Sequence, residues 1–600
     1  MADETDTPTQ PSLPTLEDMQ HWTGVLGRAQ QMMLEYGARQ MQRAQETGVE
    51  KLGEAVPAAG RLPDFPAMTL DPEKLAKAQT DFWEDSLKLW TRFLNPGDGD
   101  AEGEDAPPQR PDRRFAAPQW QNNPVFDMIR QSYLVIADHM LRSVDAIDGA
   151  DPKQKEQIRF ATQQFVDAMS PSNFALTNPA VLEKAAETKG QSFLKGLENM
   201  LTDLDKGQLT HTDPDAFTLG ENIATTPGKV VKETPLYQLI QYAPVTKKVF
   251  ETPLIIFPPW INRFYILDLN EKKSFIRWAV AQGITVFVVS WKSADESMAD
   301  VTMDDYVVRG QVDAIDTVRD LLGVESVNAI GYCVAGTTLA MTLAWLAAQG
   351  EADKVESATF FTAQVDFTEA GDLQLFIDDI QAKLIEQLGE GDGYLDGRYM
   401  AATFNLLRGR DLIWNYVVNN YLMGEEYPAF DLLHWNGDTT NLPAKWHRNY
   451  LRDFYRDNKL AEPGGLSVDG TPIDIRTVKT PSYVQAGRED HIAPPESVWK
   501  ITEHFAGPLK FVLAGSGHIA GVVNPPDAKK YQYWTNRKRT ETLEEFIAGA
   551  KETPGSWWAD WLKWLEGHAG GKIEAKGARK PGKGKLKALE DAPGSYVKTR

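Results

Sequence analysis

The feature that most constrains this chain is an apolar segment that runs through a small-residue turn into a helix, with the only cysteine at the turn. The segment spans residues 327–337 (VNAIGYCVAGT), and Cys333 is the single cysteine among 600 residues. Such a turn lifts a side chain above a sheet, and the following helix N-terminus favours a thiolate and offers N–H groups to an oxyanion. A cysteine on an apolar strand is more often an inert core thiol. The turn nevertheless favours a nucleophile.

Apolar segments alternate with amphipathic ones from residue 208 to about 535. The candidate strands are Leu254–Phe257, Thr285–Ser290, Val327–Ile330, Ala358–Thr362, Ser482–Ala486 and Lys510–Leu513. Continuous apolar runs of this kind are typical of parallel strands buried on both faces. Between them, Thr302 and Asp305 resemble a capping box, and residues 337–348 predict a buried helix. We expect an α/β fold with a doubly wound, mostly parallel sheet and sites at the strand C-terminal ends.

Composition divides the rest of the chain. The predicted segments are a helical N-terminal extension (1–94), an acidic Pro/Gly linker (95–112), a helical N-terminal domain (113–207), a catalytic α/β domain (208–569) with an inserted cap (about 368–477), and a basic Gly/Lys-rich tail (570–600). Apolar stripes from Met19 to Tyr36 and from Leu75 to Leu94 predict helices that pack on protein or bind a lipid-like surface. Residues 571–600 hold nine Lys or Arg against three acidic residues. We expect a solvated tail, with attraction to an anionic partner as the alternative.

Composition also excludes several classes of protein. One cysteine rules out an intrachain disulfide framework and a multi-cysteine metal site, so no metal or cofactor is expected. The N-terminal residues lack the pattern of a secretory signal, and no uncharged run approaches the roughly 18 residues that span a bilayer. We therefore expect a cytoplasmic protein without a transmembrane segment. The net charge of −22 disfavours nucleic-acid binding.

A thiol nucleophile needs a base and an acid that orients the base. Asp490 follows the strand candidate Ser482–Ala486, and His518 follows Lys510–Leu513. Nucleophile, acid and histidine thus occur in the chain order of α/β-hydrolase folds, at the ends of successive strands. Asp366 is the alternative acid and His491 the alternative base. We prefer His518, because its glycine-flanked loop follows the last predicted strand and could fold over a nucleophile.

An oxyanion hole requires backbone N–H donors beside the nucleophile. Val334, which follows Cys333, supplies one donor in this geometry. A second donor is expected after the strand Leu254–Phe257, where two prolines offer none. Trp260, Ile261 and Asn262 remain as candidates.

Several motifs together resemble one enzyme family. They are 331–337 (GYCVAGT), 258–269 (PPWINRFYILDL), 287–291 (FVVSW), 415–422 (NYVVNNYL), 429–436 (AFDLLHWN), 515–518 (GSGH) and 592–598 (APGSYVK). This set is similar to the signatures of poly(3-hydroxyalkanoate) synthases, most closely class I, over roughly residue 113 to the last. The family usually has glycine where this chain has Ala335. The adjacent Gly336 should let the turn accept the extra methyl group.

The resemblance implies an acyltransferase of the α/β-hydrolase fold that polymerises (R)-3-hydroxyacyl-CoA, foremost 3-hydroxybutyryl-CoA, with release of CoA. Acyl groups would be held as thioesters on Cys333, with His518 as base and Val334 in the oxyanion hole. Asp490 would either orient His518 or activate the attacking hydroxyl. The resemblance also implies a homodimer on polyester granules in the cytoplasm, with phasin-type granule proteins as partners. Trp435 would serve packing, active-site access or dimer contact.

Two other classes of function use the same features. A cysteine-type thioesterase or lactone hydrolase would have the same triad, with water as the acyl acceptor. A non-catalytic scaffold on the granule surface would depend on the amphipathic terminal segments instead.

Overall fold

The computed structural model describes Val25, Arg28, Gln31, Met32 and residues 69–94, 112–376 and 392–599. Most of the helix predicted from Met19 to Tyr36, and nearly all of the acidic linker, lie outside the described residues. The chain forms two compact units, Met1–His211 with Phe404–Tyr427, and Thr212–Thr403 with Pro428–Arg600. Among the described residues, no helix combines the length and apolar character needed to cross a bilayer.

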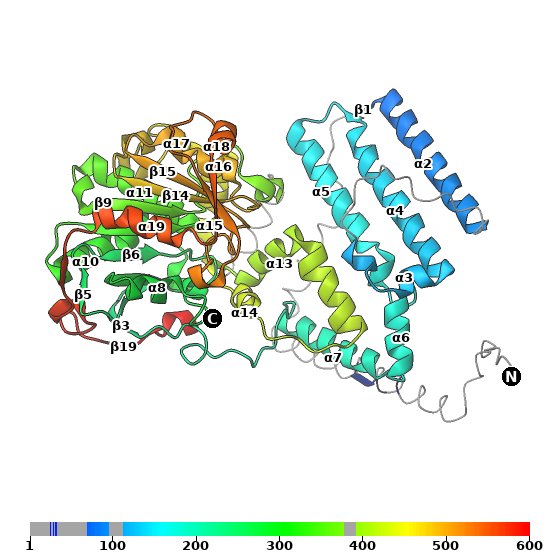
Figure 1. Ribbon diagram of the computed structural model, residues 1–600, viewed down its shortest axis with the longest axis horizontal. Coiled ribbons are helices and arrows are strands. Elements are labelled where there is room, and N and C mark those ends of the chain that lie inside the picture. Colours follow the sequence, from blue (N-terminus) through cyan, green and yellow to red (C-terminus); the bar gives the residue numbers. More distant parts are fainter. Residues whose placement is uncertain are drawn as a thin grey trace, which may run out of the picture. The chain divides into compact units, whose positions relative to one another are not determined.

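The first unit is helical. Its longer helices are α2 (Pro72–Leu94), α4 (Pro124–Asp145), α5 (Pro152–Ala168), α6 (Pro179–Glu187) and α7 (Gln191–Lys206) (Figure 1). Proline opens α4, α5 and α6, each after a side chain that accepts a backbone N–H of the first turn. Helix η11 (Val417–Leu422), from the predicted insertion, packs on α7. There the Tyr421 hydroxyl donates to Asp203 at 2.6 Å.

An eleven-stranded sheet forms the centre of the second unit, in the order β17-β16-β15-β14-β9-β8-β6-β7-β4-β3-β19. Its six central strands are parallel: β15 (Leu509–Ala514), β14 (Ser482–Gly487), β9 (Val355–Phe361), β8 (Val327–Tyr332), β6 (Leu254–Phe257) and β7 (Val286–Trp291). These confirm the six predicted strands. The outer strands pair antiparallel: β17 (Lys551–Pro554), β16 (Gln532–Thr535), β4 (Tyr237–Tyr242), β3 (Gly228–Glu233) and β19 (Glu590–Asp591).

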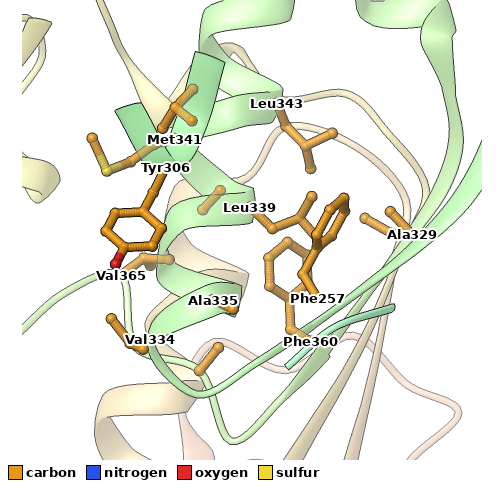
Figure 2. Close-up of a cluster of buried hydrophobic side chains, with 14 of the residues drawn as sticks. Phe257, Tyr306, Ala329, Val334, Ala335, Leu339, Met341, Leu343, Phe360 and Val365 are labelled. Carbon is orange, nitrogen blue, oxygen red and sulfur yellow. The ribbon is translucent and has the colours of Figure 1, made fainter. Parts of the chain in front are cut away.

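Successive side chains of the central strands enter two separate cores, as burial on both faces requires. Ile255 and Phe257 of β6 pack with α11 (Val334–Gln349), whereas Leu254 and Ile256 pack with α8 (Phe275–Ala281) and α19 (Trp558–Leu565). Figure 2 shows the first of these cores, with Phe257 and Phe360 from the sheet facing Leu339 of α11. The predicted buried helix, α11, therefore covers one face of the sheet, and the tryptophan-rich helix α19 covers the other.

The basic C-terminal segment belongs to the second unit and is anchored there by strand pairing, so it is not a free tail, although most of its side chains are solvent-exposed as expected. β18 (Lys572–Glu574) pairs with β5 (Lys248–Phe250), and β19 joins the main sheet beside β3. Arg579 is buried, and its guanidinium donates to the carbonyl oxygens of Phe250 and Glu251. Local composition misleads here because backbone pairing, carbonyl acceptors and a few apolar side chains such as Val597 hold this segment.

Candidate active site

Cys333 lies in a strained turn between β8 and α11. Its backbone has φ 54° and ψ −128°, a conformation that a side-chain-bearing residue rarely adopts. The turn is tight because two glycines meet beneath it. A Cβ on Gly331 would lie 2.5 Å from the Cα of Gly336, and a Cβ on Gly336 would lie 2.5 Å from the Cβ of Ala363. The sequence thus forms the turn that the apolar strand and small residues predict.

Ala335 is accepted because the close approaches fall at its neighbours. Its side chain is buried within the core that α11 forms with the sheet, where Figure 2 shows it beside Val334 in the first turn of the helix. Its carbonyl oxygen accepts a hydrogen bond of 2.9 Å from the Gln311 side chain. The Ala335 methyl group, which a glycine at this position would lack, packs in the core between α11 and the sheet.

Two strands further along the sheet, Asp490 and His518 come together. The Nδ1 atom of His518 lies 2.7 Å from Oδ2 of Asp490, and Oδ1 of Asp490 accepts the backbone N–H groups of Ile492 and Ala493, both at 2.9 Å. A carboxylate only accepts, so Nδ1 is the protonated ring nitrogen and Nε2 is available to a substrate or nucleophile. The Asp490 side chain is wholly buried, and its orientation is fixed on both sides.

His518 and Cys333 interact directly. Burial would lower the pKa of His518, but the charges of Asp490 and Cys333, with a side-chain hydrogen bond to each, raise that pKa to about 10. The Tyr332 hydroxyl donates to the His518 carbonyl at 3.0 Å, which joins the histidine loop to the strand that carries Cys333. The arrangement brings together the thiol, imidazole and carboxylate that the chain order predicts.

The alternative acid and base have other neighbours. Asp366 pairs with His504 at 3.2 Å and accepts hydrogen bonds from Thr368 and Asn458. It therefore supports a different loop. The carboxylate beside His491 in the sequence is held by His518.

The loop after β6 contains the candidates for the second oxyanion donor. The Asn262 backbone N–H donates to the Thr440 hydroxyl at 2.9 Å, and that hydroxyl donates to the Trp260 carbonyl at 2.6 Å. The Asn262 N–H therefore already has an acceptor and is not available to an oxyanion. Within the described part of the chain, no protein acceptor takes the backbone N–H of Trp260 or of Ile261. The Trp260 ring stacks on Tyr306 at 3.9 Å between centroids and anchors the loop in the core.

Trp435, which the sequence singled out for packing, access or dimer contact, is buried in the core on the α8 and α19 face. Its indole N–H donates at 2.7 Å to the carbonyl of Arg263, the residue after Asn262.

Several other residues at the site were not found from the sequence. Tyr450 and Tyr455 are buried near the thiol: burial, followed by the charge of Cys333, raises the pKa of Tyr455. Thr440, Arg263 and these tyrosines carry no local sequence signal, since each acts through a partner distant in the chain.

Comparisons with known proteins give a consistent result. The family model described as "Poly-beta-hydroxybutyrate polymerase (PhaC) N-terminus" matches residues 111–279, and the one described as "alpha/beta hydrolase fold" matches residues 254–525. The poly(3-hydroxyalkanoate) polymerase of Methylorubrum extorquens is 46% identical, over 88% of this chain and 88% of its own length. The poly(3-hydroxyalkanoate) polymerase subunit PhaC of Rhizobium meliloti is 45% identical, over 88% and 86%. That of Cupriavidus necator is 43% identical, over 92% and 93%.

Proposed function

Because this chain belongs to the poly(3-hydroxyalkanoate) polymerases, we propose that it joins (R)-3-hydroxyacyl groups from CoA thioesters through acyl thioesters on Cys333. The observation that carries the proposal is a buried imidazole that Asp490 holds at 2.7 Å and whose pKa the Cys333 side chain helps to raise. The membership makes the chain an acyltransferase.

In the acylation step, the Cys333 sulfur attacks the thioester carbonyl of the substrate, and His518 holds the thiol proton. The tetrahedral oxyanion is bound by the Val334 N–H and by the N–H of Trp260 or Ile261. When the intermediate collapses, the bond to the CoA sulfur breaks, and CoA leaves with the proton from His518. One thioester replaces another of similar energy, so the acyl group stays transferable.

In the elongation step, a 3-hydroxyl group attacks an acyl group held on Cys333. His518 takes the hydroxyl proton through Nε2 as the ester bond forms, and the sulfur of Cys333 is released. An orienting role for Asp490 is supported by its hydrogen bonds, because one carboxylate oxygen is used by His518 and the other by two backbone N–H groups. Direct activation of the hydroxyl by Asp490 would require those bonds to break.

The residues around the thiol favour transfer to an alcohol over hydrolysis. Tyr450 and Tyr455 are buried aromatic neighbours of Cys333 and come from the segment predicted as a cap. An aromatic enclosure excludes water and suits an apolar growing chain. We propose short 3-hydroxyacyl groups such as 3-hydroxybutyryl as the substrates, because that preference accompanies the class I resemblance.

The test is CoA release from (R)-3-hydroxybutyryl-CoA labelled in the acyl group. Wild-type protein should release CoA, form polymer and carry the label on a peptide that contains Cys333, whereas Cys333→Ala should do none of these. Free 3-hydroxybutyrate without polymer would favour a hydrolase. Full function in the Cys333→Ala variant would favour a scaffold.

We also propose that the chain works as a homodimer on the granule surface, together with phasin-type granule proteins. An exposed apolar stripe on α2 supports the surface contact: Trp83, Leu87 and Trp90 are 65%, 64% and 53% exposed. These residues recur on one helix face, as in helices that lie on an apolar interface.

A further inference from the structure

Arg263 is a buried cation that joins its own loop to two distant segments of the chain. It follows the oxyanion loop directly and is 2% exposed. Its guanidinium donates to the carbonyl oxygens of Thr439 at 3.2 Å, Tyr596 at 3.2 Å and Thr599 at 2.7 Å. Its Nε lies 3.4 Å from the equally buried carboxylate of Asp438. A planar guanidinium suits this task, because its donors point in fixed directions.

The main chain of the same residue is held as well. The indole of Trp435 donates to the Arg263 carbonyl at 2.7 Å, and the Tyr265 hydroxyl donates to Asp438 at 2.8 Å. One residue earlier, the Asn262 N–H is bound by Thr440. Residues 435–440 and the C-terminal residues 596–599 therefore fix the loop from two directions.

The C-terminal residues that accept from Arg263 are anchored in the sheet. The N–H groups of Ser595 and Tyr596 both donate at 3.1 Å to Oε1 of Gln238, in β4. The Tyr596 hydroxyl donates to the Thr234 carbonyl at 2.7 Å, and Val597 is buried in the core on the α8 and α19 face. This end of the chain is a rigid support for the guanidinium.

We propose that Arg263 is a positioning residue that holds the Trp260–Ile261 backbone against the developing oxyanion by tying its loop to the C-terminal Tyr596 and Thr599 carbonyls. The inference rests on the proposed function and deepens it, since it makes the C-terminal segment part of the active-site support. Oxyanion stabilisation depends on donors that are in place before charge develops. A loop released from Arg263 loses that placement although Cys333 and His518 remain.

The test compares Arg263→Lys with Arg579→Lys in the full chain. Both positions are buried arginines that bind backbone carbonyls, but Arg579 contacts Phe250 and Glu251, at the N-terminal edge of the parallel strands. Two rates are measured for each variant: single-turnover acylation of Cys333 by (R)-3-hydroxybutyryl-CoA, and alkylation of Cys333 by iodoacetamide, which forms no oxyanion. Arg263→Lys should slow acylation by about 10- to 100-fold with alkylation nearly unchanged. Arg579→Lys should leave both rates near wild type.

Trp435→Phe is the second variant in case Arg263→Lys does not fold. It keeps an aromatic ring but removes the donor to the Arg263 carbonyl, so acylation should fall several-fold while alkylation stays constant. Unchanged acylation in either folded variant, or an equal loss of acylation and alkylation, would overturn the proposal. If Cys333→Ala still turns over substrate, the proposed function itself fails. That result can be told apart from the two outcomes that would overturn the role of Arg263.

Discussion

At the residue scale, His518 lies between two groups that favour its protonated form. Asp490 accepts from one ring nitrogen and the Cys333 side chain contacts the imidazole, so the pKa is raised although burial alone would lower it. The imidazole is therefore protonated and oriented before substrate binds. The turn that presents Cys333 to it is strained, since Cys333 has a positive φ.

This pKa makes a prediction about stability. The folded-state pKa of His518 is about 10, above its ordinary value of 6.5, so the protonated imidazole stabilises the fold. That stabilisation is complete below pH 6.5 and is lost as the pH rises towards 10. The difference in unfolding free energy between wild type and His518→Gln should shrink over this range, as measured by denaturant unfolding at several pH values.

The control for this prediction is Asp490→Asn. Removing the carboxylate charge removes a main cause of the raised pKa, so the pH dependence should weaken in this variant while the protein remains folded. A stability difference that stayed constant from pH 6.5 to 10 would contradict the coupling described here.

At the scale of elements, the close contact of β8 with α11 predicts which glycine is essential. Gly336→Ala places a Cβ against Ala363 and the Gly331 carbonyl, at 2.5 and 2.9 Å, so the unfolding free energy should fall by about 1–3 kcal/mol. Gly567→Ala is the matched control, because a Cβ there meets nothing within 4 Å. Denaturant unfolding of both variants measures the difference. Equal stability would show that the turn is looser than its contacts indicate.

Helix α2 makes a separate prediction about the granule surface. Replacing Trp83, Leu87 and Trp90 with serine removes the exposed stripe, so binding to poly(3-hydroxybutyrate) particles should weaken by about tenfold or more, while CoA release from soluble substrate is retained. Val245→Ser, a change at a 69% exposed apolar residue of the second unit, should leave binding unchanged. Co-sedimentation with the particles measures both. Undiminished binding in the triple variant would assign the contact to another surface.

The same elements show what the sequence could predict. The six central strands are found within three residues of their predicted ends, because an apolar run buried on both faces is visible in any short window. β4 was missed although all its residues are buried, since Gln238 and Gln241 interrupt its apolar pattern. Their partners lie in the C-terminal segment, at Ser595 and Ala578, and no local window contains them.

The candidate site divides in the same way. Cys333, Asp490 and His518 follow strands whose ends could be located, so their meeting could be predicted from chain order. The choice among the oxyanion donors could not be predicted, because it depends on Thr440, which lies far along the chain from Asn262. Arg263 was missed for the same reason: its role exists only through the carbonyls of the C-terminal residues.

At the scale of the whole molecule, the C-terminal segment completes the second unit. It adds a strand to the edge of the main sheet, pairs with β5 and supplies the carbonyls that hold the oxyanion loop. This lysine-rich segment is thus part of the folded unit. Its contacts join residues more than 300 positions apart, so the edge of the sheet at β3 and β4 and the C-terminal segment depend on each other.

Gln238 makes several of the hydrogen bonds that attach the C-terminal segment to the sheet. Its amide nitrogen lies within hydrogen-bond distance of Glu233, Glu590 and Ser595, and its carbonyl oxygen accepts from the Ser595 and Tyr596 N–H groups. Gln238→Leu keeps the volume but removes these hydrogen bonds, and it leaves the half-buried Tyr596 N–H without its acceptor, at a cost of about 1 kcal/mol or more. Amide hydrogen exchange should therefore speed up in residues 589–597 while β8 and β14 stay protected. Gln282→Leu, on the half-buried end of α8, should not change exchange there. Unaltered exchange in Gln238→Leu would mean that β19 and the core contact of Val597 hold the segment without the amide.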